Sequence, residues 1–147
     1  MKNYIGTKII AAFPEVKTAT PGEGADKPGY AVIYPDGYRS WSPKDVFEEA
    51  YRAIDGEGQA LTFGDALHML KLGKKVARAG WNGKGMFLFL VPGSTFFVSR
   101  PPLLGIYPED TQIDYHAHID MKTANGQIVP WLCSQTDALA EDWQIVE

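Results

Sequence analysis

The 147-residue chain contains little cysteine, no long apolar run and no excess of positive charge. Its single cysteine, Cys133, excludes an internal disulfide and a zinc site built from several thiolates. No apolar stretch approaches the roughly 18 residues that a membrane-spanning helix needs. The first residues lack the apolar core and the small-residue cleavage site of a secretory signal. We therefore expect a protein of a reducing cytoplasm, with no membrane partner.

The net charge of -4 argues against binding along a DNA or RNA backbone, which needs a broad basic face. Charge is nonetheless unevenly distributed along the chain. Residues 61–104 carry six basic residues against Asp65, whereas residues 105–147 carry Lys122 against eight acids. Either the basic and acidic segments attract each other, within one fold or across a symmetric interface, or residues 71–84 form the cationic rim of a pocket.

Apolar residues make up 45% of the chain, which is enough for a hydrophobic core, and a glycine-containing linker divides it. We expect a small N-terminal module at 1–55, a linker at 56–60 and a second domain at 61–147. The module is too small for a stable core of its own, so we expect it to pack on something else. Within it, a strand is predicted at 8–12 and a proline- and glycine-rich loop at 14–29.

The rest of the module predicts a strand, a turn and a helix. Residues 30–34 are rich in β-formers, and 35–37 (PDG) predict a turn. Ser42 is predicted as the N-cap of a helix, with Pro43 at the first helical position and Asp45 in the first turn.

The second domain begins with a helix capped by Thr62 and Asp65 and ended by Gly73. The pattern then changes to strands, with a chain reversal at 92–94 and a hairpin at Asn125–Gly126. Strands are predicted at 75–79, 86–91, 95–98, 113–121, 127–129 and 143–146, with a short helix at 134–140. The expected fold class is α+β, an antiparallel sheet packed with one main helix.

A glycine-rich segment at 78–87 combines side chains that suit a nucleotide ligand. Glycine lets a ligand approach the backbone, aromatic rings supply π-faces for a base, an amide can bond a base edge, and cations can meet phosphates. The alternative is an ordinary turn with a core tryptophan, and the spacings of a P-loop or a dinucleotide fingerprint are missing. The candidate binding residues are Arg78, Trp81, Asn82, Lys84, Met86 and Phe87.

A second segment, 130–137, places a tryptophan just before a predicted helix N-terminus. Free backbone N–H groups at such a terminus can bind an anion beside the aromatic ring. The alternative is a capped helix with a packed tryptophan. The candidate residues are Trp131, Ser134, Gln135 and Asp137.

Four polar residues, Asp114, His116, His118 and Asp120, share one face of the strand predicted at 113–121. Two histidines at this spacing can chelate zinc, and the corresponding enzyme would be a metal-dependent phosphodiesterase. No third ligand is identifiable, so we interpret this face as a polar sheet surface and predict no metal and no cofactor.

Nothing in the sequence forms a convincing catalytic group. Cys133 has no histidine beside it in sequence, and no nucleophile elbow occurs. Glu141 and Asp142 are adjacent acids near a predicted C-terminal strand, which is weak support for acid–base chemistry. A binding protein fits this pattern better than an enzyme.

Two long motifs carry a resemblance to a known family. Residues 61–67 (LTFGDAL) with 73–86 (GKKVARAGWNGKGM), and residues 131–143 (WLCSQTDALAEDW), resemble the second Thoeris anti-defence family of phages. The resemblance covers 61–147. It implies a sponge that binds the cyclic ADP-ribose-type signal of the defence system's TIR enzyme without cleaving it, so that the effector stays inactive. Some relatives also sequester cyclic oligonucleotides of CBASS immunity.

The resemblance also implies a small helix-plus-sheet subunit in a homotetramer, with ligand pockets between subunits. Adenine would stack on Trp81, Phe87 and Trp131. Ribose or phosphate would be hydrogen-bonded by Asn82, Ser134 and Gln135. Phosphate charge would be offset by Arg78 and Lys84.

Two parts of the chain depart from the shortest members of that family. Residues 91–118 look longer than those members need and are expected to form an added interface or a second pocket. The N-terminal module resembles one found at the start of assorted small phage proteins, with no activity attached to it. The alternative function is therefore a phage structural or host-factor interaction protein with no nucleotide ligand.

Overall fold

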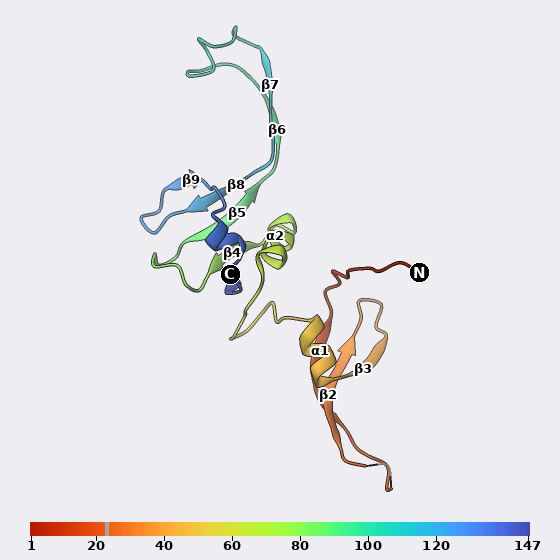
Figure 1. The fold of residues 1–147 in the computed structure, drawn as a ribbon. Helices are drawn as coiled ribbons and strands as arrows, with labels where there is room; N and C mark the ends of the chain where they lie inside the picture. The colour runs from red at the N-terminus through yellow and green to blue at the C-terminus, as the bar shows by residue number, and fades with distance from the viewer. Residues whose placement is uncertain (23) are drawn as a thin grey trace. The chain divides into compact units, whose positions relative to one another are not determined.

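The computed structural model describes residues 1–22 and 24–147, which divide into two units, Met1–Arg52 and Ala53–Glu147 (Figure 1). The predicted α+β class is confirmed, because the described strands pair antiparallel and the described helices are few and short. Among the described residues, no helix has the length and apolarity to span a bilayer.

The N-terminal unit is a three-stranded sheet with one helix on it. Its elements are β1 (Ala11–Lys17), β2 (Lys27–Ile33), β3 (Arg39–Pro43) and α1 (Lys44–Ala50). Tyr30 of β2 stacks on Phe47 of α1, with ring centroids 4.1 Å apart, so the helix packs on this face of the sheet. On the other face Ala31 is fully buried between its cross-strand partners Phe13 and Trp41.

The loop predicted at 14–29 is too long, since β1 and β2 pair antiparallel at 14–17 and 27–29. Proline is tolerated here because of where it lies in the sheet. Pro14 is on the edge strand β1, and Pro28 lies beyond the end of β3, so neither occupies a position with partners on both sides. The strand predicted at 8–12 is shifted along the chain, since β1 begins at Ala11 and ends at Lys17.

The predicted start of α1 is also wrong. Ser42 belongs to β3, where its backbone is paired with Tyr30. The N-cap is Pro43, which provides no side-chain hydrogen bond to the helix. The turn predicted at 35–37 is confirmed, with the Gly37 N–H donating to the carbonyl oxygen of Tyr34 at 2.8 Å.

The C-terminal unit is a five-stranded antiparallel sheet in the order β10-β4-β5-β8-β9. These strands are β4 (Lys75–Arg78), β5 (Phe87–Val91), β8 (His118–Lys122), β9 (Ile128–Pro130) and β10 (Trp143–Val146). Helix α2 (Phe63–Lys71) packs on one face and completes the core. The buried core residues are Leu61, Ala66, Met69, Leu70, Val76, Leu88 and Trp143.

Helix α2 begins and ends as its sequence predicts. The backbone N–H of Asp65 donates to the Thr62 hydroxyl at 3.2 Å, and the backbone N–H of Thr62 donates to the Asp65 carboxylate at 2.9 Å. This capping box satisfies N–H groups that have no partner within the helix. Gly73 follows the helix at a φ of +81°, a conformation that favours glycine. The hairpin predicted at Asn125–Gly126 is likewise confirmed between β8 and β9.

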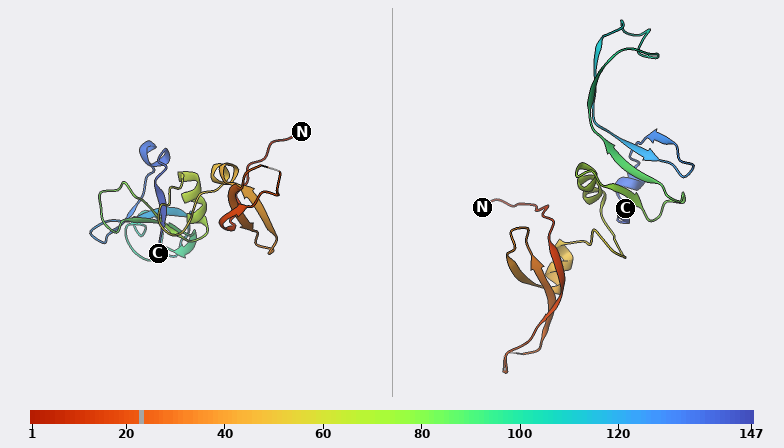
Figure 2. Two further views of the ribbon diagram at one scale, coloured as in Figure 1. Left: turned by 90° about the horizontal axis from the view of Figure 1, so that it is seen from below. Right: turned by 180° about the vertical axis from the view of Figure 1, so that it is seen from behind.

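Strands β5 and β8 continue beyond the sheet as an arm made of β6 (Ser94–Phe97) and β7 (Gln112–Tyr115) (Figure 1, Figure 2). The pairing register is unchanged from sheet to arm. Val91 faces His118 at the end of the sheet, and Ser94 faces Tyr115 at the start of the arm. The two segments are therefore one long antiparallel ribbon with a local break.

Two predictions for this ribbon are wrong. Residues 92–94 do not reverse the chain, and the strand predicted at 113–121 is interrupted after Tyr115. Pro92 has no N–H to donate to the ladder. A Cβ atom on Gly93 would lie 2.9 Å from the carbonyl oxygen of Tyr115, so the two chains approach closely here. The ladder is lost at this point while the register is kept.

Candidate functional site

The glycine-rich segment leaves the sheet at Arg78 and is tied at once to the start of β10. The backbone N–H of Gly80 donates to Oδ2 of Asp142 at 2.8 Å. A Cβ atom on Gly80 would lie 2.8 Å from that same oxygen, so a larger residue here would push the Asp142 carboxylate away. The backbone N–H of Trp81 donates to the carbonyl oxygen of Arg78 at 3.3 Å, which closes the turn.

The second segment is placed by β9 and a capped turn of helix. The backbone N–H of Trp131 donates to the carbonyl oxygen of Ile119 at 3.0 Å, which extends the sheet pairing by one residue. Helix α3 (Gln135–Ala138) follows, and Ser134 is its N-cap as predicted, accepting from the Asp137 N–H at 3.0 Å. The Ser134 hydroxyl in turn donates to Oδ2 of Asp137 at 2.8 Å.

Asp137 joins the two segments. Its Oδ1 accepts Nη1–H of Arg78 at 2.8 Å and the indole N–H of Trp81 at 3.2 Å. Its carbonyl oxygen accepts the indole N–H of Trp143 at 3.0 Å. A second carboxylate, Asp142, accepts Nε–H of Arg78 at 2.8 Å. Two carboxylates that lie 59 and 64 positions after Arg78 in sequence are thus bound to its guanidinium.

This ion cluster is largely shielded from solvent. The side chains of Arg78, Asp137 and Asp142 are 17%, 15% and 34% exposed. Burial acts to raise the pKa of Asp137, but hydrogen bonds from Arg78, Ser134 and Trp81 outweigh it and hold that pKa below its ordinary value. The hydrogen bond from Arg78 is the largest cause of the lowered pKa of Asp142. Two ionised carboxylates share one cation, so the cluster carries an excess of negative charge.

Three indoles and a phenyl ring meet beside this cluster. Trp143 is fully buried, with the ring of Trp81 edge-on at 5.5 Å and that of Trp131 edge-on at 6.2 Å between centroids. Phe63 of α2 packs on Trp143 at 5.4 Å. Trp81 and Trp131 are half-buried, so each rests on the core and still presents part of its ring to solvent.

The structure brings five of the candidate residues into this one network of contacts. They are Arg78, Trp81, Trp131, Ser134 and Asp137. The side chains of Asn82, Lys84 and Gln135 are exposed on the same two segments. Met86 packs against Gly83, where an added Cβ atom would lie 2.0 Å from its Sδ. Ligand contacts for all of these residues stay predictions.

Phe87 does not join the tryptophans within one chain, and its predicted stacking on a ligand base stays a prediction. Neighbouring strand residues point to opposite faces of a sheet. Leu88 points into the core with Trp143, so Phe87 points to the other face. There it packs near Phe89, and the Lys75 ammonium lies 5.0 Å from its ring centroid.

The family described as Thoeris anti-defense 2-like domain matches residues 61–146, more than half of the chain. The chain belongs to this family. Thoeris anti-defense 2 of Bacillus phage SP01 is 44% identical over 86 residues, which cover 58% of this chain and 94% of that protein. The family resemblance carried by 61–67, 73–86 and 131–143 is thereby confirmed.

The Thoeris anti-defense 2-like domain contains the whole tryptophan cluster and also the arm. The range 91–118, expected as an addition, lies inside the matched residues and is part of the family domain. The N-terminal unit Met1–Arg52 lies outside the match. What that unit does is therefore not given by the family.

Three residues of the domain's cluster escaped the sequence analysis as site residues: Phe63, Asp142 and Trp143. Asp142 was considered only as a possible acid, and Trp143 only as part of an edge strand. Their signal is weak in sequence because their partners are distant along the chain. The one local hint is that Asp142 and Trp143 are the last two residues of the second family motif, 131–143.

The histidine-bearing strand face does not come together as a metal site. The break in the ribbon separates Asp114, which accepts a hydrogen bond from Thr95 at 2.7 Å, from His118 and Asp120 in the sheet. Within residues 1–22 and 24–147, no three histidine, cysteine or acidic side chains gather closely enough to hold a metal ion.

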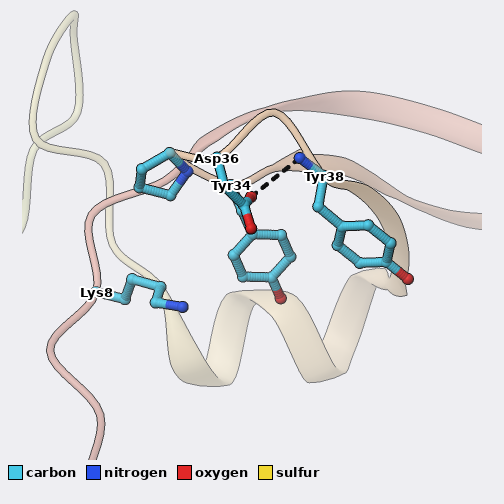
Figure 3. Close-up of a pocket in the computed structure, with 5 residues that line it drawn as sticks. Lys8, Tyr34, Asp36 and Tyr38 are labelled. Atoms are coloured by element: carbon cyan, nitrogen blue, oxygen red, sulfur yellow. Dashed lines mark hydrogen bonds between the residues drawn. The ribbon is translucent and has the colours of Figure 1, made fainter.

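Outside the family domain, the N-terminal unit has a surface hollow of about 370 Å³ (Figure 3). Its lining includes Tyr34 and Tyr38, whose ring centroids are 5.9 Å apart, and Lys8, whose ammonium lies 5.1 Å from the centroid of Tyr34. The carboxylate of Asp36 is already used by the backbone N–H of Tyr38 at 3.0 Å. The hollow contains no residue of the tryptophan cluster.

Proposed function

We propose that the Thoeris anti-defense 2-like domain of this protein sequesters a cyclic nucleotide signal of bacterial immunity without breaking a bond in it. The preferred ligand is the cyclic ADP-ribose isomer made by the TIR enzyme of a Thoeris system, with cyclic oligonucleotides of CBASS as a further class. Holding the signal keeps the effector inactive in the host cytoplasm. The observation that carries this proposal is the convergence of both family motifs on the half-exposed indoles of Trp81 and Trp131.

The arrangement suits a purine-bearing ligand. Stacking of a base on an aromatic side chain contributes about 1–3 kcal/mol. The rings of Trp81 and Trp131 rest on the buried Trp143, so little side-chain freedom is lost when a base stacks on them. Ribose and phosphate would be hydrogen-bonded by exposed polar groups of the same two segments. We assign these contacts to Asn82, Ser134 and Gln135.

Phosphate charge is best met by Lys84 in this proposal. Arg78 already donates to the carboxylates of Asp137 and Asp142, and the three side chains together carry excess negative charge. Lys84 is the other cation of the glycine-rich segment and is exposed. We therefore place phosphates toward Lys84 and bases toward the indoles.

The electrostatics of the cluster support binding over catalysis. A general acid at neutral pH needs a carboxyl pKa raised toward 7. The pKa values of Asp137 and Asp142 are instead lowered, chiefly by Arg78, so both groups stay ionised. We propose that the protein is not an enzyme and that it works as a homotetramer with pockets between subunits. Sequestration needs an affinity near nanomolar, about -12 kcal/mol, to compete with an effector.

The test is recovery of the ligand after binding. The full chain is incubated with the TIR-made cyclic ADP-ribose isomer, freed of unbound ligand and heated, and the released nucleotide is analysed by mass spectrometry. We expect intact cyclic ADP-ribose isomer in an amount stoichiometric with protein. Recovery of a hydrolysed product would identify an enzyme, and recovery of no nucleotide would favour the structural or host-factor alternative.

Trp81→Ala is expected to weaken binding of the same cyclic ADP-ribose isomer at least tenfold, because it removes one stacking surface. Calorimetric titration measures the affinity, and size-exclusion chromatography checks that the assembly is intact. Trp41→Phe, a substitution in the N-terminal unit, is the matched control and should bind as the wild type does. Equal affinity of the Trp81→Ala variant and the wild type would remove Trp81 from the site.

A further inference from the structure

Asp137 makes more contacts than a helix cap requires. Its Oδ2 accepts from the Ser134 hydroxyl, which is the capping role. Its Oδ1 accepts from the indole N–H of Trp81, and its carbonyl oxygen accepts from the indole N–H of Trp143. One residue therefore holds two indoles that come from different elements, the loop after β4 and the strand β10.

Helix α2 offers a comparison, because an aspartate takes part in its cap as well. Asp65 occupies the same third helical position, and its carboxylate accepts from Thr62 at 2.9 Å, as Asp137 does from Ser134. Both helices thus start with a hydroxyl cap that donates to an aspartate at the third helical position. The contacts of Asp137 with Trp81, Trp143 and Arg78 are an addition to it.

We propose that Asp137 is a positioning residue, which sets the orientation of the Trp81 and Trp143 rings and makes no contact with the ligand. The expected effect on ligand affinity rests on the proposed function, whereas the ring orientation is a property of the free protein. It differs from the sequence prediction, in which Asp137 and Arg78 were themselves ligand contacts.

The geometry supports positioning over direct contact. Oδ1 of Asp137 already accepts two hydrogen bonds and Oδ2 accepts one, so the carboxylate has little acceptor capacity left for a ribose hydroxyl. Arg78 fixes that carboxylate in turn, and Asp142 fixes Arg78 from the other side. The chain of contacts Asp142–Arg78–Asp137–Trp81 holds the loop after β4 to the start of β10 and to α3.

The experiment measures the indole N–H groups by nitrogen–proton NMR of the full chain without ligand. In the wild type we expect the indole protons of Trp81 and Trp143 to exchange slowly with solvent. In Asp137→Asn, the amide oxygen can still accept from Trp81 and Arg78 but the negative charge that pairs with Arg78 is lost, so the Trp81 signal should shift and exchange faster. In Asp137→Leu, the slow exchange of Trp81 should be lost altogether.

Affinity for the TIR-made cyclic ADP-ribose isomer should follow the same order. We expect about a tenfold loss in Asp137→Asn, which weakens the hydrogen bond to Trp81 by removing its charge, and a larger loss in Asp137→Leu, which removes the bond. Asp65→Asn is the matched control: it weakens the cap of α2 and should leave the Trp81 signal and the affinity at the wild-type values.

The outcomes separate the inference from the function it rests on. A wild-type Trp81 indole proton that exchanges freely overturns the positioning role, without any variant having to fold. An Asp137→Asn variant that loses affinity while its indole signals stay unchanged also overturns it, because Asp137 would then be a ligand contact. Slow exchange of Trp81 in a wild type that binds no nucleotide supports positioning and removes the proposed function.

Discussion

Replacing Arg78 by alanine should lower the free energy of unfolding of the C-terminal unit by about 2–4 kcal/mol. The guanidinium is 17% exposed and binds two carboxylates at 2.8 Å, so its removal leaves two shielded negative charges without a counter-ion. It also frees the loop that Gly80 and Trp81 begin. Urea unfolding followed by circular dichroism measures this loss.

The stability deficit of Arg78→Ala relative to the wild type should depend on pH. In the wild type, the lowered pKa values of Asp137 and Asp142 contribute stability that is complete above the unfolded carboxyl pKa of about 4. That contribution disappears as the pH falls through the folded pKa values. Without Arg78, burial and mutual repulsion raise both pKa values, so protonation relieves the penalty. The deficit of the variant should therefore shrink between about pH 7 and pH 4.

Arg100→Ala is the control for this prediction. Arg100 is an exposed arginine of the same unit, and its replacement should change the unfolding free energy by less than about 0.5 kcal/mol. A deficit in Arg78→Ala that is equally small, or that grows toward acid pH, would show that the two carboxylates do not depend on Arg78.

Trp143→Ala should destabilise the C-terminal unit by about 3–5 kcal/mol and abolish ligand binding. The side chain is fully buried, and its loss leaves a cavity beneath Trp81, Trp131 and Phe63. Both half-exposed indoles then lose the ring on which they rest. Thermal unfolding measures the stability, and calorimetric titration with the cyclic ADP-ribose isomer measures the binding.

Substitution of another buried core residue separates these two effects. Leu70→Ala on α2 also empties a fully buried position and should cost about 2–5 kcal/mol. Its folded fraction should still bind, because Trp143 keeps its contacts. Trp143→Phe keeps a ring but loses the hydrogen bond to Asp137, and serves if Trp143→Ala does not fold. Equal binding losses in Leu70→Ala and Trp143→Phe would mean that binding follows stability alone.

Features set by neighbouring residues could be predicted from the sequence. The capping box of Thr62 and Asp65, the cap of Ser134 and the hairpin at Asn125–Gly126 each need only residues a few positions apart. The same local rules failed at Ser42, because its backbone is paired with Tyr30 in the sheet and the helix starts after it. Tertiary pairing overrode a local preference there.

Some members of the candidate site were predictable from the sequence, but its architecture was not. Trp81 and Trp131 were singled out from composition, yet nothing local places both on Trp143. Phe87 was grouped with them because it is close in sequence, whereas the alternation of β5 puts it on the opposite face. Arg78 could be a counter-ion of carboxylates or a residue that binds phosphate. Only its long-range contacts with Asp137 and Asp142 distinguish the two roles.

The constant register of the long ribbon bears on how this domain tolerates insertions and deletions. Val91 opposes His118 and Ser94 opposes Tyr115 with no slip between them. Trimming both strands by equal amounts leaves the surviving partners aligned, while trimming one strand by a single residue more than the other would exchange the two faces of that strand. The length of the arm can thus change by equal insertions or deletions in its two strands, while the five-stranded sheet and the indoles stay as they are.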